Sequence, residues 1–204
     1  MPVWTPEKVW EDQDVYIIGG GNSLKHFDFS LLHNKCTVGC NDAYKHGVIT
    51  SKVCIFGDTR WFNTHKDELD KYGGPVFTST PALSKSRIPW LWTLPRKTVG
   101  CHKDALGWNF NTGACATNLA VLLGAKKVYL LGFDMQLIEG ESNWHHNSLN
   151  KPDADIYPKF IEGFVALKKD MDKMCPEVEV INITDDSALD LYPKIGVTDF
   201  WKGN

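Results

Sequence analysis

The first residues that could do chemistry follow a short apolar run at positions 15–18. They are Gly19, Gly20, Gly21, Asn22 and Ser23. This order predicts a strand, a tight turn and the start of a helix. Glycine permits positive φ and a close approach of ligand to backbone, and a helix capped by Asn22 or Ser23 would direct free N–H groups at an anion. We therefore expect these five residues to bind a phosphate group, with a ligand-free turn as the alternative.

The glycine motif is incomplete as a known fingerprint. Leu24 stands where the dinucleotide-binding pattern has its third glycine, and no Gly-Lys-Ser/Thr sequence follows. The turn is therefore neither a full dinucleotide-binding fingerprint nor a P-loop, and the rest of the chain must decide whether it binds a ligand.

Polar residues also follow the next two apolar runs. Asn41 and Asp42 stand where a doubly wound fold commonly places a ribose-binding side chain, and an amide offers both donors and acceptors to a ribose or a base edge. Asp58 follows the third run. We expect these three residues to contact a nucleotide; an Asx-turn that only ends the strand is the alternative for the first pair.

Thr112 and Gly113 precede the clearest helical stretch, residues 114–123. A hydroxyl group and free amides at a helix start form an anion site, so this helix and the glycine turn could hold one phosphate from two sides. A plain N-cap would have the same sequence.

His145 and His146 come after Asp134, which ends the most apolar run of the chain. A neutral imidazole beside a strand end suits a general base, and surface histidines without a role are the alternative. No HExxH motif or cysteine partner accompanies them, so we predict no metal site. Asp134 could bind Mg²⁺, orient a histidine or only cap its strand.

Length and composition limit the classes of function. The 204 residues, 43% hydrophobic and 23% charged, suit one globular domain spanning residues 1–204. A net charge of −3 without a basic cluster argues against a nucleic-acid partner. We also expect no membrane span and, from cysteine usage and the absence of a signal-peptide pattern, a cytoplasmic location. Aromatic residues in expected loops favour a homo-oligomer.

The order of the elements predicts the architecture. Strand patterns at residues 15–18, 36–40, 53–56, 73–79, 128–134 and 178–183 alternate with helical patterns at 22–32, 114–123 and 158–174. A polar helix that carries Phe62, His65 and Leu69 is expected after the third strand. This alternation predicts an α/β, Rossmann-like fold, a mostly parallel twisted sheet with helices on both faces. Ligands of such sheets bind at the carboxyl ends of the strands, where the residues above fall. We expect irregular residues 81–110 to form a functional loop and residues 136–157 a lid or catalytic loop.

Three blocks of the sequence resemble the bacterial lipooligosaccharide α-2,3-sialyltransferases. VYIIGGGNSLK at 15–25, followed by FDFS, is similar to their G-N/G-G-P-S-L…D-(Y/F)-S opening, and GCND at 39–42 to their R-C-N segment. Residues 111–134 are similar to their T-S-G-V…I-Y-L-S-G-I-D-F segment. The same blocks recur in archaeal 6-hydroxymethylpterin pyrophosphokinases, motility-accessory-factor glycosyltransferases and phage proteins. Residues 57–61 and 143–145 resemble the phage group most, which implies a phage origin and hence a host-cytoplasm location.

The resemblance implies a glycosyltransferase that takes a CMP-sialic-acid-like donor and a small-molecule or glycan acceptor and requires no cofactor. Asn22, Ser23 and Asn41 would contact the nucleotide, Thr112 and Gly113 the phosphate and ribose, and His145 would be the base, with His146 as the next candidate. The chain departs from the family where Asn22 replaces a proline and Gly20 an asparagine, and in a shorter segment before His145 that lacks the lid tyrosines.

Two other functions stay open. The first is a Mg²⁺-dependent pyrophosphokinase or other nucleotide phosphotransferase, with Asp58 or Asp134 as metal ligands. The second is a non-catalytic nucleotide-binding phage protein.

Overall fold

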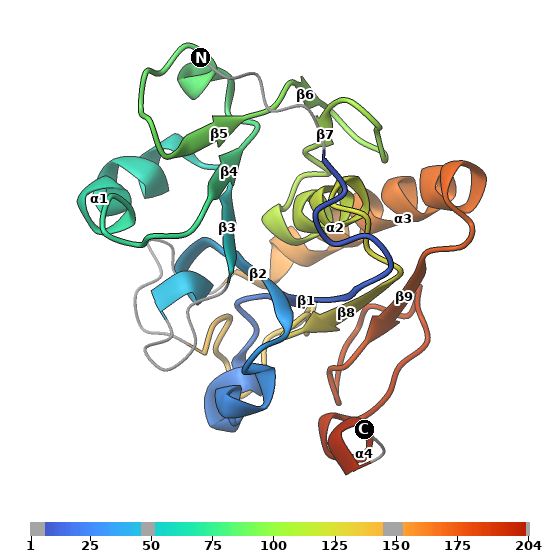
Figure 1. Cartoon of the computed structure of the whole chain (residues 1–204). Helices are drawn as coiled ribbons and strands as arrows, with labels where there is room; N and C mark the ends of the chain where they lie inside the picture. The colour runs from blue at the N-terminus through green and yellow to red at the C-terminus, as the bar shows by residue number, and fades with distance from the viewer. Residues whose placement is uncertain (1–6, 46–51, 145–152, 203–204) are drawn as a thin grey trace.

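A seven-stranded, fully parallel sheet forms the centre of the molecule (Figure 1). The computed structural model describes residues 7–45, 52–144 and 153–202. Along the chain the strands of this sheet are β1 (Asp14–Ile18), β2 (Cys36–Cys40), β3 (Val53–Phe56), β4 (Val76–Thr78), β5 (Leu91–Thr93), β8 (Lys127–Leu131) and β9 (Glu179–Asn182). Their spatial order is β5-β4-β3-β2-β1-β8-β9, so the chain reverses direction across the sheet between β1 and β8. The predicted mostly parallel α/β sheet is confirmed.

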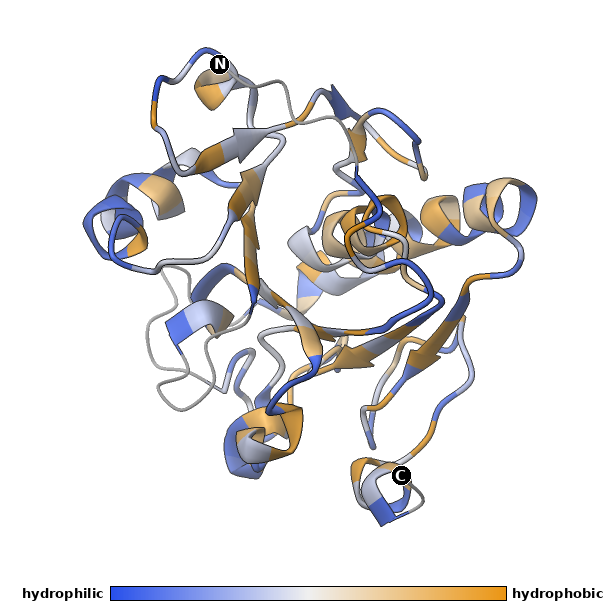
Figure 2. Ribbon diagram, in the orientation of Figure 1, coloured by the Kyte–Doolittle hydropathy of each residue, from blue (hydrophilic) through white to orange (hydrophobic). Residues whose placement is uncertain are grey.

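Alternate residues of the central strands pack on opposite faces of the sheet. In β1, Val15 and Ile17 belong to one buried cluster, and Tyr16 and Ile18 to another. This division follows from the two-residue period of a strand, and strands covered on both faces are apolar throughout. Figure 2 shows this apolar character along the sheet and α2.

Helices cover both faces, as expected. Helices α2 (Thr112–Leu122) and α3 (Tyr157–Met174) pack together on one face, while α1 (Thr59–Leu69) lies on the other side of β3 and β4 (Figure 1). The C-terminal α4 (Val197–Lys202) covers β1 and β8 through Phe200, which packs on Tyr16 and Tyr129. Among the described helices, none is both long and apolar enough to cross a bilayer.

Two expected elements differ in the structure. The helix predicted at 22–32 is two short 3₁₀ helices, η1 (Asn22–His26) and η2 (Phe29–Leu32), separated where Phe27 is extended and the Asp28 side chain accepts the amide of Ser30. Three further 3₁₀ helices are η3 (Asn41–Lys45), η4 (Pro81–Leu83) and η5 (Ala154–Ile156).

The stretch 81–110, expected to be irregular, contains β5 and a small parallel pair, β6 (Arg96–Lys97) and β7 (Leu106–Gly107). These strands are only two or three residues long, and Pro89 and Pro95 stand close to two of them. Such short runs carry little periodicity, so only tertiary pairing defines them.

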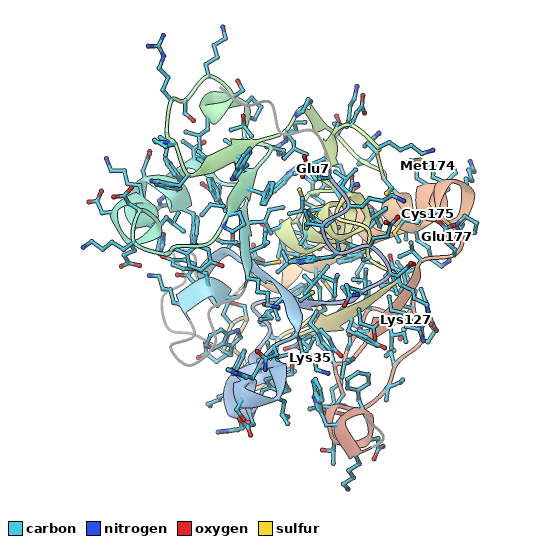
Figure 3. The ribbon with its side chains drawn as sticks, viewed as in Figure 1. Glu7, Lys35, Lys127, Met174, Cys175 and Glu177 are labelled. Carbon is cyan, nitrogen blue, oxygen red and sulfur yellow. The ribbon has the colours of Figure 1, made fainter. Side chains whose placement is uncertain are left out.

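The predicted site residues lie at the end of the sheet formed by the carboxyl ends of the strands. The opposite edge is marked by Lys127 at the start of β8 (Figure 3), whose ammonium pairs with Glu179 at 3.0 Å. All the polar residues that follow β1, β2, β3 and β8 therefore lie at one end of the sheet.

Helix α3 approaches the site through a glycine. A Cβ at Gly163 would overlap the backbone oxygen of Asn109, in the turn that precedes α2. The absence of a side chain thus lets α3 lie directly against that turn.

We predict that Gly163→Ala lowers the free energy of unfolding by about 2 kcal/mol, because overlap with a backbone atom outweighs the gain in helix propensity of about 1 kcal/mol. Urea denaturation measures this value. Val165→Ala is the control on the same helix, since Val165 is 48% exposed, and it should leave stability almost unchanged. A Gly163→Ala variant more stable than wild type would contradict the packing described.

Candidate functional site

A cavity of about 630 Å³ opens at the carboxyl ends of the strands. Its walls come from the turn after β1, the ends of β2, β3 and β8, the start of α2, and the start of α3. The predicted site residues in its lining are Gly19, Gly20, Gly21, Asn41, Asp42, Asp58, Thr112, Gly113 and Asp134. Segments far apart in sequence thus meet at the edge where a ligand was expected.

Four predicted residues are not in this lining. Asn22 and Ser23 lie just behind the wall, where their side chains bond to other parts of the protein. His145 and His146 lie outside the described residues.

The glycine turn allows the ends of β1 and β8 to approach each other closely. None of Gly19, Gly20 and Gly21 has a left-handed φ, so the expectation of positive φ in this turn is wrong; Gly132, at the end of β8, has φ 71° instead. A Cβ at Gly21 would lie 2.5 Å from Asp134 Oδ1 and 2.6 Å from the oxygen of Gly132. The Gly21 amide donates to that oxygen at 2.9 Å. Glycine is therefore required because β1 and β8 touch here.

The protein's own carboxylate occupies the start of η1. The Ser23 amide donates to Asp134 Oδ2 at 3.0 Å, and the Ser23 hydroxyl to Oδ1 at 2.5 Å. The Asn22 side chain donates to the oxygen of Ile138 at 3.1 Å. The expectation that the Ser23 amide is free for a phosphate is therefore wrong, because the carboxyl group of Asp134 already accepts it.

Burial raises the pKa of Asp134, and the nearby charge of Asp186 raises it further. The hydrogen bonds from Ser23 and the Asn22 backbone act in the opposite direction. The net increase means that the protein stabilises the neutral acid relative to the carboxylate at this position.

The start of α2 is the better anion site. Asn111, the N-cap, accepts the Ala114 amide at 2.7 Å and donates to the oxygens of Asn109 and Phe160. The Thr112 and Gly113 amides, first in the helix, have no carbonyl partner one turn earlier. Within the described chain, the Thr112 hydroxyl also has no hydrogen-bond partner. These donors and the helix dipole favour an anion in the adjacent cavity.

Asn41 presents a free amide to the cavity. It follows β2 with φ 52°, a left-handed conformation that asparagine tolerates better than most residues. Its half-buried side chain has no hydrogen-bond partner in the part of the chain that the structure describes. Donor and acceptor atoms therefore remain available to a ligand.

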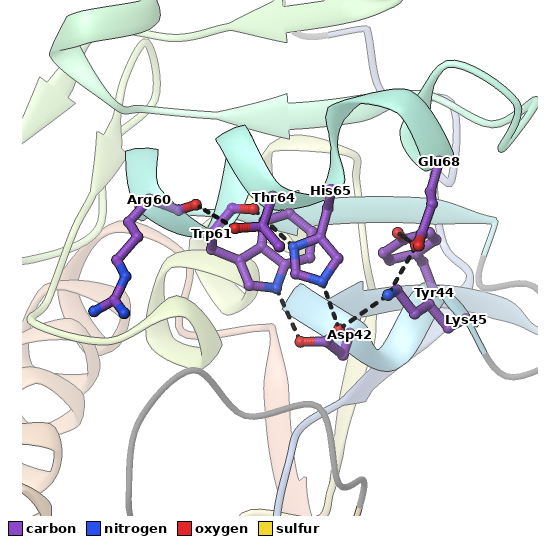
Figure 4. Close-up of polar contacts among 8 residues, drawn as sticks. All are labelled: Asp42, Tyr44, Lys45, Arg60, Trp61, Thr64, His65 and Glu68. Atoms are coloured by element: carbon purple, nitrogen blue, oxygen red, sulfur yellow. Dashed lines mark hydrogen bonds and ion pairs between the residues drawn. The ribbon is translucent and has the colours of Figure 1, made fainter.

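Asp42, in contrast, holds a buried polar network (Figure 4). Its Oδ2 accepts from Trp61 Nε1 at 2.9 Å, and its Oδ1 lies 3.1 Å from His65 Nε2. His65 Nδ1 lies 2.7 Å from the Trp61 carbonyl oxygen, so both ring nitrogens face oxygen atoms. Lys45 lies 3.6 Å from Asp42 and 2.8 Å from Glu68. Asp42 thus ties η3 to α1, a role that sequence analysis missed.

Asp58 caps α1. Its Oδ1 accepts the amides of Arg60 at 2.6 Å and Trp61 at 3.2 Å. Asp58 and Asp134, the two expected Mg²⁺ ligands, therefore both accept hydrogen bonds from backbone amides. The described residues contain no cluster of three histidine, cysteine or acidic side chains placed to bind a metal ion.

The cavity is also lined by aromatic residues that were not predicted site residues, among them Trp108, Phe110, Tyr157 and Phe160. A Cβ at Gly57 would overlap the Trp108 indole, which shows how closely this ring covers the end of β3. The Arg96 guanidinium lies 4.3 Å from the Trp108 ring centre. Trp108, Phe110 and Tyr157 fall in the two loop regions that were expected to be functional, and Phe160 lies in the helix that follows the second.

Backbone strain gathers around the same cavity. Asn109, Phe110 and Met135 have φ values of 52°, 60° and 52°. Such conformations cost energy in residues other than glycine and persist only where the surroundings enforce them. At Asn109 the buried side-chain amide enforces this conformation by bonding to the backbone of Gly100 and Gly107.

We predict that Asp42→Asn destabilises the protein by about 3 kcal/mol, because an amide cannot accept from Trp61 and His65 together and leaves a buried donor unpaired. Urea unfolding gives the value. Asp67→Asn, on the exposed face of α1, should change it by less than about 0.5 kcal/mol. Equal stabilities of the two variants would show that the network does not hold η3 to α1.

We predict that Asp134→Asn is at least as stable as wild type at neutral pH. A raised pKa means that the folded protein binds more protons than the unfolded chain between the ordinary and the raised pKa, so stability falls as pH rises through that interval. The asparagine carries no such dependence and can still bond to Ser23.

Unfolding curves at several pH values test this prediction. The difference in free energy between Asp134→Asn and wild type should move in favour of the variant as pH rises. The exposed Asp104→Asn variant should show no such trend. A marked loss of stability in Asp134→Asn at every pH would mean that the charge itself holds the turn.

The comparisons with known proteins bear on the fold. No model of a known protein family and no curated protein sequence matches the chain. Solved structures do. The sialyltransferase CstII from Campylobacter jejuni, in complex with cytidine-5′-monophosphate, has a TM-score of 0.59 at 15% identity, over 91% of this chain and 86% of that one. The monofunctional α-2,3-sialyltransferase Cst-I from the same organism has a TM-score of 0.52 at 19% identity, over 89% and 79%.

A second CstII complex, with CMP-3FNeuAc, has a TM-score of 0.54 at 15% identity, covering 90% of this chain and 86% of its own. The match extends over nearly the whole chain, well beyond the sequence blocks that first indicated it. The protein therefore shares its α/β fold with the Campylobacter sialyltransferases.

Proposed function

We propose that the protein is a glycosyltransferase that uses a nucleotide-sugar donor of the CMP-sialic acid kind. The observation that carries the proposal is that one cavity joins the turn after β1, the free amide of Asn41 and the Thr112-Gly113 helix start. This arrangement lies where the strand order reverses, the place at which such sheets bind nucleotides. The structures with this fold include complexes with CMP and with a CMP-sugar analogue, which supports the same ligand class here.

The α2 start is proposed to bind the donor phosphate. Its amides and the Thr112 hydroxyl are suited to an oxyanion. Asn41, at the end of β2, is proposed to contact the nucleoside. Trp108 and Tyr157 add aromatic surface on which a base or sugar ring can pack.

His145 is proposed as the general base. Its neighbour in sequence, Trp144, donates from its backbone amide to Gly20 at 3.0 Å and from its indole to Gly19 at 3.1 Å. These bonds hold Trp144, the residue directly before His145, beside the cavity, which supports this role. In the proposed reaction the acceptor oxygen bonds to the anomeric carbon, the bond from that carbon to the phosphate oxygen breaks, the acceptor proton passes to His145, and CMP leaves.

We predict that CMP binds without Mg²⁺ and raises thermal stability. A ligand at 100 times its Kd stabilises a protein by about 2.7 kcal/mol, which a thermal-shift assay detects. Thr112→Ala and Asn41→Ala should each weaken CMP binding about tenfold, the equivalent of one hydrogen bond. Thr98→Ala, exposed and outside the cavity, is the control. A Mg²⁺-dependent shift with ATP or GTP, and none with CMP, would instead indicate phosphotransfer.

We predict that His145→Ala abolishes release of CMP from CMP-sialic acid but leaves CMP binding unchanged, because a base acts only in the transition state. His146→Ala is the comparison and should retain most of the activity. Tight CMP binding with no turnover in the wild type, over a broad set of acceptors, would identify a nucleotide-binding protein without catalysis.

A further inference from the structure

The charges around the cavity are unevenly balanced. Four aspartates line it: Asp42, Asp58, Asp134 and Asp153. Among the described lining residues, Arg60 is the one lysine or arginine. An anionic ligand would therefore meet mostly acidic side chains unless Arg60 or the α2 start provides positive charge.

All four aspartates already face donors from the protein. Asp42 pairs with Trp61 and His65, and Asp58 caps α1. Asp134 accepts from Ser23, and Asp153 accepts the amide of Asp155. Their charges are therefore partly compensated from within, so Arg60 is not needed to neutralise them.

The backbone of Arg60 is fixed, whereas its guanidinium has no partner. The Arg60 amide donates to Asp58 at 2.6 Å, and its carbonyl accepts from the Thr64 hydroxyl at 3.1 Å. No ion pair or hydrogen bond of the guanidinium occurs within the described chain. Figure 4 shows the side chain directed away from the Asp42, His65 and Glu68 network, where the other charged groups pair with one another.

The other two arginines differ in this respect. Arg96 is half-buried against the Trp108 ring, at 4.3 Å from its centre. Arg87 is exposed in the segment between η4 and β5 and does not line the cavity. Arg60 is thus the arginine that combines a fixed helix start, an unpaired head group and a place in the cavity wall.

We infer that Arg60 binds an oxyanion of the ligand through its planar guanidinium. Two parallel N–H donors match the oxygens of a phosphate or carboxylate, a fit that lysine cannot reproduce. The inference rests on the proposed function for the identity of the ligand, and it adds Arg60 to the binding residues proposed above. In a CMP-sugar the oxyanion is either the phosphate or the sugar carboxylate.

The test compares ligands with and without each anion by isothermal titration calorimetry at low salt. Wild type, Arg60→Gln, Arg60→Lys and the control Arg87→Gln are titrated with cytidine, CMP, CMP-sialic acid and inorganic pyrophosphate. Because Arg60 is exposed, its variants should keep the wild-type melting temperature.

If Arg60 binds the phosphate, Arg60→Gln should weaken the binding of CMP by about tenfold or more and the binding of cytidine by less than about twofold. If it binds the carboxylate, the tenfold loss should appear with CMP-sialic acid and not with CMP. In either case the affinity of Arg60→Lys should lie between those of wild type and Arg60→Gln, and the loss of affinity should be smaller at high salt. Arg87→Gln should bind every ligand as wild type does.

Equal weakening of cytidine and CMP, or no weakening of any ligand, would overturn the oxyanion role. The failure of the proposed function has a different signature. If wild type bound pyrophosphate in an Arg60-dependent manner but not CMP or CMP-sialic acid, the oxyanion site would stand and the CMP-sugar donor would be wrong. If wild type bound none of the anions, both would be wrong.

Discussion

The site depends on the direct contact between the ends of β1 and β8. These two strands are neighbours in the sheet but far apart in sequence, and the Gly21 amide bonds to the Gly132 oxygen where they end. Asp134 then bonds back to Ser23 across the same junction. Only residues without a Cβ allow this approach, so the glycines of the turn set the position of the cavity's inner wall.

The second constraint acts from the other side of the cavity. The Asn109 amide holds a strained turn in place, α3 packs on that turn at Gly163, and Asn111 then caps α2. Because each of these contacts involves backbone atoms, the start of α2 has little freedom to move. A rigid helix start with unpaired amides is preorganised for an anion, and it needs no rearrangement on binding.

Polar and charged residues at this end of the sheet divide into two groups. Asp42, Asp58 and Asp134 are engaged by internal donors and maintain the walls. Asn41, Arg60 and Thr112 have side chains that no described residue engages. Carboxylates alone would repel a nucleotide, so this division explains how an acidic rim is compatible with the proposed ligand. It also separates residues whose substitution affects stability from those whose substitution affects binding.

Local pattern was enough to determine the architecture of this protein. The apolar runs and helical stretches predicted the parallel sheet, its covering helices and the edge that carries the site, because hydrophobic period and turn residues are local properties of the chain. The prediction of one helix after β1 was wrong because a contact of the Asp28 side chain ends the first 3₁₀ helix early. Strands β5, β6 and β7 were not predicted because strands so short show no hydrophobic period.

What each polar residue bonds to was decided by tertiary structure alone. Sequence placed Asp42, Asp134 and Asn41 in one class, yet the first two bond to Trp61 and Ser23 and the third stays free. Sequence places Arg60 just after a strand end, but only packing shows that it belongs to the cavity wall. Hydrogen bonds between residues distant in sequence exist only after the strands and helices have packed. The chain by itself therefore determined which strand ends carry the candidate site, and packing determined which of its groups remain unpaired.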